Sequence, residues 1–129
     1  MRRYSRTGAA AVLAVTLLLL HACEDQGPEG APGTLTAVVV SPNGAEGAAW
    51  LELVGSGLGA VTAADGRAFS ERRGDTVQVV VVREEAGELV FLVQVDDATL
   101  LPSAVLHEVA DGDNQLRADL SGYRVEVRP

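Results

Sequence analysis

The feature that most constrains the fold is a run of four consecutive valines, Val79 to Val82, within the apolar segment 76–82. β-Branched side chains lose rotamer freedom in a helix and pack well on a pleated sheet, so this segment predicts a strand. Segment 89–95 has the same character. Because both segments carry apolar residues on both faces, we expect them at central positions of a sheet.

Six further segments after residue 34 also have the pattern of short strands separated by turns. They cover residues 35–41, 48–54, 60–64, 67–70, 104–109 and 123–127. We expect one hairpin at Asp65-Gly66, the dipeptide favoured in two-residue turns, and another at 84–87. From residue 34 onward, no segment shows the apolar spacing of an amphipathic helix over three turns.

The sequence of residues 111–127 also predicts which side chains point toward the core. Strict alternation places Tyr123, Val125 and Val127 inward, with the charged residues between them outward. The polar loop 111–121 precedes this strand, and we expect its two leucines, Leu116 and Leu120, to fill the core.

Seven or eight short strands with a turn about every ten residues are the pattern of an antiparallel β-sandwich. A small β-barrel is the alternative, since strand count alone does not separate the two. About 95 residues suffice for one hydrophobic core, so we predict a single all-β domain over residues 34–129. The valine-rich pair and the closing strand after Gly122-Tyr123 resemble those of cohesin and immunoglobulin-like sandwiches. This resemblance implies a fold and no activity.

Residues 1–22 have the composition of a secretory signal peptide. Three arginines lie within the first six residues, and an uncharged apolar run follows over 9–20. A membrane-spanning helix needs about 20 apolar residues, so this run is too short to be an anchor. A basic start followed by a short apolar segment is instead typical of a signal that is removed on export.

Leu20-His21-Ala22-Cys23 resembles the lipobox of bacterial lipoproteins, with His21 departing from the small or β-branched residue usual there. The resemblance covers residues 1–23. It implies cleavage before Cys23 and attachment of fatty acids such as palmitate through a diacylglyceryl thioether. Cys23 is the only cysteine, so an intramolecular disulfide is excluded. Two or three acyl chains give lasting attachment at about 0.8 kcal/mol per buried methylene.

The lipobox implies a protein anchored to the cell membrane or outer membrane, facing the periplasm or the exterior. Residues 23–33 are rich in Gly, Pro and acidic residues, which predicts a flexible linker after the lipidated cysteine. Three of the ten arginines leave with the signal, so seven arginines face 18 acidic residues, a net charge of −11. Nucleic acid needs a basic footprint, so it is not an expected partner. We expect the membrane, through the lipid, and an envelope protein or glycan.

Trp50 is the candidate binding residue. It alternates with Leu51 and Leu53 and therefore faces away from them. An exposed aromatic residue would mark a binding face for sugar or protein, but core filling on a two-sided strand is the favoured interpretation. His107 is interpreted as a partly buried strand histidine that shares a face with Val105 and Val109.

Several other patterns are interpreted as turns. Asp111-Gly112-Asp113-Asn114 resembles the start of a calcium loop, with Asp111 and Asp113 as the ligands. The sixth position is Leu116 instead of Gly and the last is Gly122 instead of Glu, so no metal is predicted. Arg73-Gly74-Asp75 spells an adhesion tripeptide, and is interpreted as a turn before the valine-rich strand.

We therefore expect a non-catalytic, lipid-anchored binding or structural module, with no catalytic residues and no cofactor. Two alternatives remain. One is a cell-surface hydrolase that uses acidic residues of the loops, namely Asp96, Asp97, Asp111 and Asp113. The other is a calcium-stabilised spacer domain.

Overall fold

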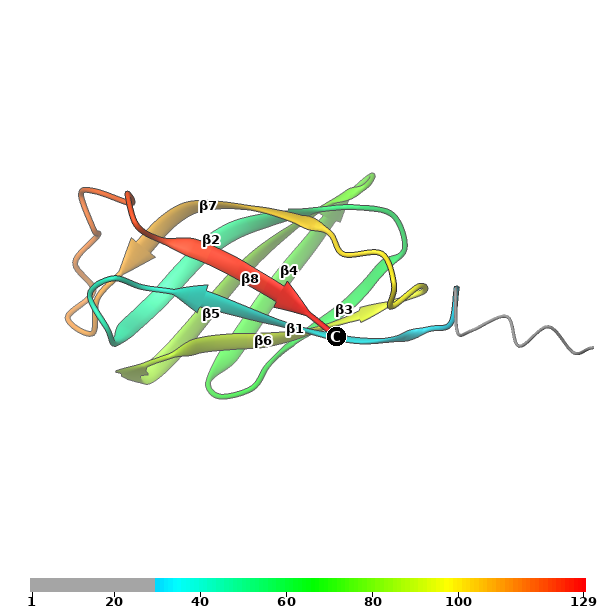
Figure 1. Cartoon of the computed structure of the whole chain (residues 1–129). Helices are drawn as coiled ribbons and strands as arrows, with labels where there is room; N and C mark the ends of the chain where they lie inside the picture. Colours follow the sequence, from blue (N-terminus) through cyan, green and yellow to red (C-terminus); the bar gives the residue numbers. More distant parts are fainter. Residues whose placement is uncertain (1–29) are drawn as a thin grey trace, which may run out of the picture.

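The computed structural model describes residues 30–129. The predicted signal peptide, Cys23 and most of the predicted linker lie outside the described residues. The described chain folds into eight strands (Figure 1). The strands are β1 (Gly33–Val40), β2 (Glu46–Val54), β3 (Leu58–Ala63), β4 (Arg67–Arg73), β5 (Thr76–Gly87), β6 (Leu89–Val95), β7 (Ser103–Ala110) and β8 (Arg124–Arg128).

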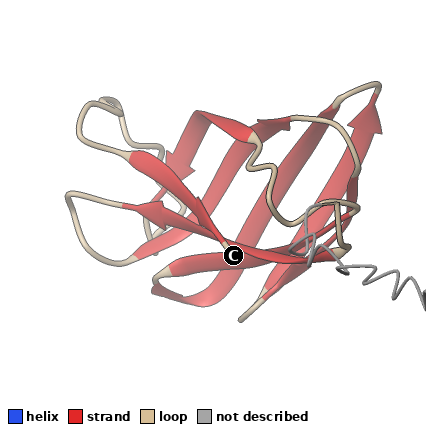
Figure 2. Ribbon diagram, turned by 45° about the vertical axis from the view of Figure 1, so that its right-hand side comes forward, coloured by secondary structure: helices blue, strands red, loops and turns tan. Residues whose placement is uncertain are grey.

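The strands form two four-stranded antiparallel sheets that pack face to face (Figure 2). The β1 sheet has the order β3-β6-β1-β8, and the β2 sheet has the order β4-β5-β2-β7. Each sheet keeps two open edges, so the barrel alternative does not apply. The predicted all-β sandwich is confirmed, and each segment predicted to be a strand is one.

Most connections cross from one sheet to the other. Of the seven connections, only β4–β5 joins neighbouring strands of one sheet. The predicted hairpin at Asp65-Gly66 is wrong, because this turn leads from β3 in one sheet to β4 in the other. The hairpin predicted at 84–87 is also wrong, because β5 extends to Gly87 and the chain then crosses to β6. Gly66 has a φ of 85°, and a corner between sheets uses that conformation as readily as a hairpin does.

The single hairpin turns at Gly74-Asp75. Arg73 pairs with Thr76, which leaves a two-residue loop, and Gly74 has a φ of 63°. Glycine with positive φ at the first central position is the requirement of a type II′ turn. Turn chemistry therefore accounts for the Arg73-Gly74-Asp75 sequence.

The core lies between the two sheets and consists of aliphatic side chains around Phe91. β5 and β6 occupy the predicted central positions. Only the inner face of β5 is buried, however: Val79 and Val81 are fully covered, whereas Val80 and Val82 are each 37% exposed. The outer face of the β2 sheet is thus apolar but open to solvent.

The end of the chain closes one side of the core. Tyr123, Val125 and Val127 pack against it, as predicted, and so does Leu120. The prediction for Leu116 is wrong, because this side chain is 64% exposed. Leu116 forms a β-bridge with Ala110 at the edge of β7, which takes it away from the space between the sheets.

Gly47 in β2 lies against the backbone of the loop that follows β7. A Cβ atom at this position would lie 2.4 Å from the carbonyl oxygen of Asp111. We therefore expect Gly47→Ala to lower the free energy of unfolding by about 1–3 kcal/mol. Urea denaturation followed by the fluorescence of Trp50 measures this loss.

Gly55→Ala is the matched control, since a Cβ there first meets the side chain of Pro102, at 3.3 Å, and a small shift relieves the contact. Equal losses of unfolding free energy in the two variants would contradict a specific close approach of Gly47 to the Asp111 carbonyl.

Candidate functional site

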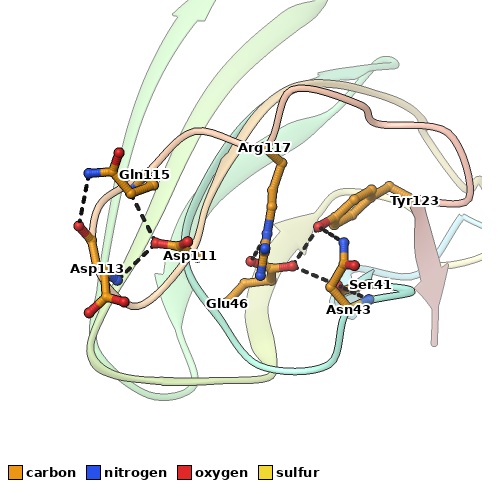
Figure 3. A network of polar contacts seen from close by, with 8 residues as sticks. All are labelled: Ser41, Asn43, Glu46, Asp111, Asp113, Gln115, Arg117 and Tyr123. Atoms are coloured by element: carbon orange, nitrogen blue, oxygen red, sulfur yellow. Dashed lines mark hydrogen bonds and ion pairs between the residues drawn. The ribbon is translucent and has the colours of Figure 1, made fainter.

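A buried carboxylate, Glu46, lies where β2 begins (Figure 3). The residue is only 2% exposed. Its Oε1 atom accepts hydrogen bonds from the Ser41 hydroxyl at 2.6 Å and from the Tyr123 hydroxyl at 2.5 Å. Its Oε2 atom accepts a hydrogen bond from Nε of Arg117 at 3.0 Å. We call these four residues the Glu46 cluster.

The Glu46 cluster joins two connections that are distant in sequence. Ser41 belongs to the β1–β2 connection, whereas Arg117 and Tyr123 belong to the connection between β7 and β8. A buried charge is tolerated only where it is paired and hydrogen-bonded, and both oxygens of Glu46 are engaged. The cluster therefore acts as a structural clamp at this end of the sandwich.

The acidity of Glu46 fits a clamp better than a catalytic role. Burial raises the pKa of the Glu46 carboxyl, but hydrogen bonds from Ser41, Tyr123 and Arg117 outweigh that effect. Together with the charge of Arg117, they hold the pKa below its ordinary value. A general acid or base needs a pKa near the working pH, so this carboxylate is poorly suited to proton transfer.

The carboxylates that the hydrolase and calcium alternatives would use are not all brought together. Val95 pairs with Gly33, so Asp96 and Asp97 follow β6 beside the start of β1. Ala110 pairs with Ala48 near the start of β2, so Asp111 lies at the opposite end of the sandwich (Figure 1). Within residues 30–129, no group of three or more Asp, Glu, His or Cys side chains is arranged to hold a metal ion.

Each acidic loop instead uses its carboxylate to order its own backbone. Asp111 accepts hydrogen bonds from the backbone N–H groups of Gln115 at 3.0 Å and Asp113 at 2.9 Å. These two bonds hold the pKa of Asp111 below its ordinary value. Asp97 accepts hydrogen bonds from both the N–H and the hydroxyl of Thr99, and these bonds lower the pKa of Asp97 as well. The turn interpretation of the Asp111 loop agrees with this geometry.

A polar pocket of about 500 Å³ lies where the β3–β4 corner meets the end of β5. The guanidinium of Arg83 lies 2.6 Å from the Asp65 carboxylate and also donates hydrogen bonds to the carbonyl oxygens of Glu85 and Glu88. Arg83 thus stabilises the corner, and each of its three guanidinium nitrogens contacts an oxygen of the protein itself. We regard this pocket as part of the corner's structure.

Trp50 lies on the outer face of the β2 sheet, as its alternation with Leu51 and Leu53 predicts. Those two leucines are fully buried, and Trp50 is half-buried. The core-filling interpretation is therefore wrong. The indole ring lies 4.7 Å from the imidazole of His107, centroid to centroid, with the planes tilted by 32°.

Residues from four strands and one loop make the surroundings of Trp50 apolar. The register aligns Phe69, Val80 and Trp50 in one row across β4, β5 and β2. Beside this row lies a shallow pocket of about 280 Å³. We call its lining the Trp50 pocket: Ala48, Ala49, Trp50, Val80, Glu108, Ala110 and Leu116. Leu116 is exposed because its side chain lines this surface pocket and not the core.

A β-bulge in β7 brings His107 beside Trp50. Trp50 pairs with Glu108 and the next residue of β2 pairs with Leu106, so His107 has no opposite residue. A bulge reverses the alternation beyond it, and Val109 is accordingly buried whereas Val105 is 48% exposed. The prediction that Val105 and Val109 share the face of His107 is correct for Val105 and wrong for Val109.

His107 is partly buried, as predicted, with its side chain 32% exposed. Its Nε2 atom lies 3.4 Å from Oε2 of Glu52 and makes no hydrogen bond among the described residues. Glu52 in turn accepts a hydrogen bond from the amide of Gln78 at 3.3 Å. The Trp50 pocket therefore has an acidic flank, formed by Glu52 and Glu108.

Comparison with protein-family models, with curated proteins and with solved structures gives no match to this chain. In residues 30–129 there is no helix with the length and apolar character needed to cross a membrane.

Removing the charge of Glu46 tests the clamp. At pH 7 we expect Glu46→Gln to lower the free energy of unfolding by roughly 1–3 kcal/mol, because the amide keeps only one of the two acceptor oxygens and loses the charge that pairs with Arg117. The folded-state pKa of Glu46 is lowered, so its contribution is present above the unfolded pKa of about 4.3 and is lost at lower pH. The difference between the two proteins should narrow as the pH falls from 5 to about 3.

Urea denaturation across this pH range measures the difference. Glu84→Gln is the control, since Glu84 is exposed near the end of β5 and its substitution should not affect stability measurably. A difference between wild type and Glu46→Gln that stays constant from neutral to acidic pH would contradict the clamp.

Proposed function

We propose that this protein is a lipid-anchored module of the cell envelope that binds a protein partner through the Trp50 pocket and has no catalytic activity of its own. The observation that carries the binding role is the open apolar pocket on an otherwise solvated sheet. Exposed apolar surface with a polar border is typical of interaction sites.

The path of the chain supports an anchor at one end of the sandwich and the Trp50 pocket toward the other. The described chain enters the sandwich at the start of β1, where the Ala98 N–H donates to the carbonyl of Ala31. The Trp50 pocket lies toward the other end, where Ala48 pairs with Ala110. A lipid on Cys23, ahead of the linker, would therefore hold the near end at the membrane and present the pocket away from it.

The lining favours a protein segment over a glycan. Sugar rings stack on an open aromatic plane and need several hydrogen-bonding groups, whereas Trp50 is half-covered and lies beside His107. The rest of the lining is Ala, Val and Leu with one carboxylate, Glu108. An apolar side chain fits such a lining, and a neighbouring Lys or Arg would complement Glu108 and Glu52.

The fluorescence of Trp50 tests the proposal directly, because Trp50 is the only tryptophan. The full chain in detergent is titrated with synthetic peptides that carry Leu or Phe between two arginines. We expect saturable changes in emission that weaken with salt, and a loss of affinity of at least tenfold when the arginines become glutamine. Leu116→Asp should abolish the response, since it places a charge in the pocket wall.

Leu100→Asp is the matched control: Leu100 is 57% exposed and lies in the β6–β7 loop, outside the pocket. An equal effect of the two substitutions would overturn the assignment. A response to oligosaccharides with none to the peptides would replace the protein partner with a glycan. The absence of any response would remove the binding role.

The anchor is tested separately by mass spectrometry of the protein extracted from membranes. We expect a mature chain that begins at a lipid-modified Cys23, and a Cys23→Ala variant that leaves the membrane fraction. An unmodified Cys23, or retention of residues 1–22, would contradict lipid anchoring while leaving the test of the pocket unaffected.

A further inference from the structure

β4 is the most regular of the four open edges of the sandwich. The edge strand β3 has a register shift in its pairing with β6, and β7 carries the bulge at His107. The fourth edge, β8, has only five residues. β4 has seven residues in unbroken register with β5, and all except the half-buried Ala68 are exposed. A regular, uncovered edge is a template for another strand.

The hairpin determines which backbone groups face this open edge. In a hydrogen-bonded two-residue turn the flanking pair, Arg73 and Thr76, is joined by the turn's own hydrogen bond. Antiparallel pairs then alternate, so Arg67, Phe69, Glu71 and Arg73 direct their N–H and C=O groups toward β5. Ala68, Ser70 and Arg72 direct theirs toward the open edge.

The side chains on the outer face of β4 make the edge complementary to itself. Arg67, Phe69 and Glu71 follow one another at two-residue spacing. If two copies pair antiparallel about Phe69, the two phenylalanines lie opposite each other. Arg67 of each copy then lies opposite Glu71 of the other. Opposite charges and aromatic pairs stabilise cross-strand positions, and like charges destabilise them.

The adjacent registers lack this complementarity. Moving the centre to Ser70 places Arg67 opposite Arg73 of the other copy. Moving it to Ala68 places Glu71 opposite Asp65. Both alternatives oppose like charges, so the charge pattern selects the register about Phe69.

We propose that the partner of the β4 edge is a second copy of this chain. The two β4 strands pair antiparallel about Phe69 and join two four-stranded β2 sheets into one continuous sheet with two-fold symmetry. Phe69, which is 58% exposed in the single chain, becomes covered by its counterpart. Within one chain Glu71 pairs with Arg73, and both side chains are exposed. This ion pair is therefore weak and competes little with Arg67 of the other copy for Glu71.

Disulfide trapping in membranes tests the pairing with the full chain. Directly opposite residues have Cβ atoms about 4.5–5.5 Å apart, close enough for a disulfide after a small shift. Phe69→Cys should give a covalent dimer of twice the chain mass under mild oxidation. Leu100→Cys, equally exposed at 57%, is the control and should give at least tenfold less dimer. The chain without an added cysteine is a second control, because any covalent dimer that it forms must come from Cys23.

Charge exchange in the Phe69→Cys background tests the register. Arg67→Glu alone places two glutamates opposite each other, and Glu71→Arg alone opposes two arginines, so each should lower the dimer yield severalfold. Mixing the two variants restores both opposite-charge pairs and should restore the yield as a heterodimer. Equal yields from Phe69→Cys and Leu100→Cys, insensitivity to charge exchange, or trapping of a different protein would overturn the proposal.

Discussion

One buried carboxylate, Glu46, anchors the connections at the end of the sandwich where β2 begins. The chain crosses repeatedly between the sheets, and the long β7–β8 connection pairs with β7 only through the bridge between Leu116 and Ala110. Arg117 and Tyr123 anchor that connection on Glu46. Leu116, next to Arg117, then forms a wall of the Trp50 pocket. The shape of the proposed binding surface therefore depends on a polar interaction inside the fold.

The sequence was sufficient for the strands because their signals are local. β-Branched runs identified β5 and β6, and alternation gave the inward direction of Val125 and Val127. The predicted hairpin at Asp65-Gly66 failed for a physical reason: a turn residue specifies that the chain reverses, and the packing of the whole core specifies which sheet receives the next strand.

The candidate site was only partly predictable. Alternation placed Trp50 on the outer face correctly, because period two is a property of any regular strand. The bulge at His107 interrupts that period without a sequence signal, so the burial of Val109 could not be anticipated. The partners of Glu46 lie 5, 71 and 77 residues away, and only the folded topology brings them together.

The central claim is that the Glu46 cluster holds the connection that shapes the Trp50 pocket. Hydrogen–deuterium exchange of the full chain, wild type against Glu46→Gln, tests it most directly. The account predicts faster exchange in residues 41–45 and 111–123, with β5 and β6 still protected. Unchanged exchange in 111–123, or a uniform increase over all strands, would contradict it.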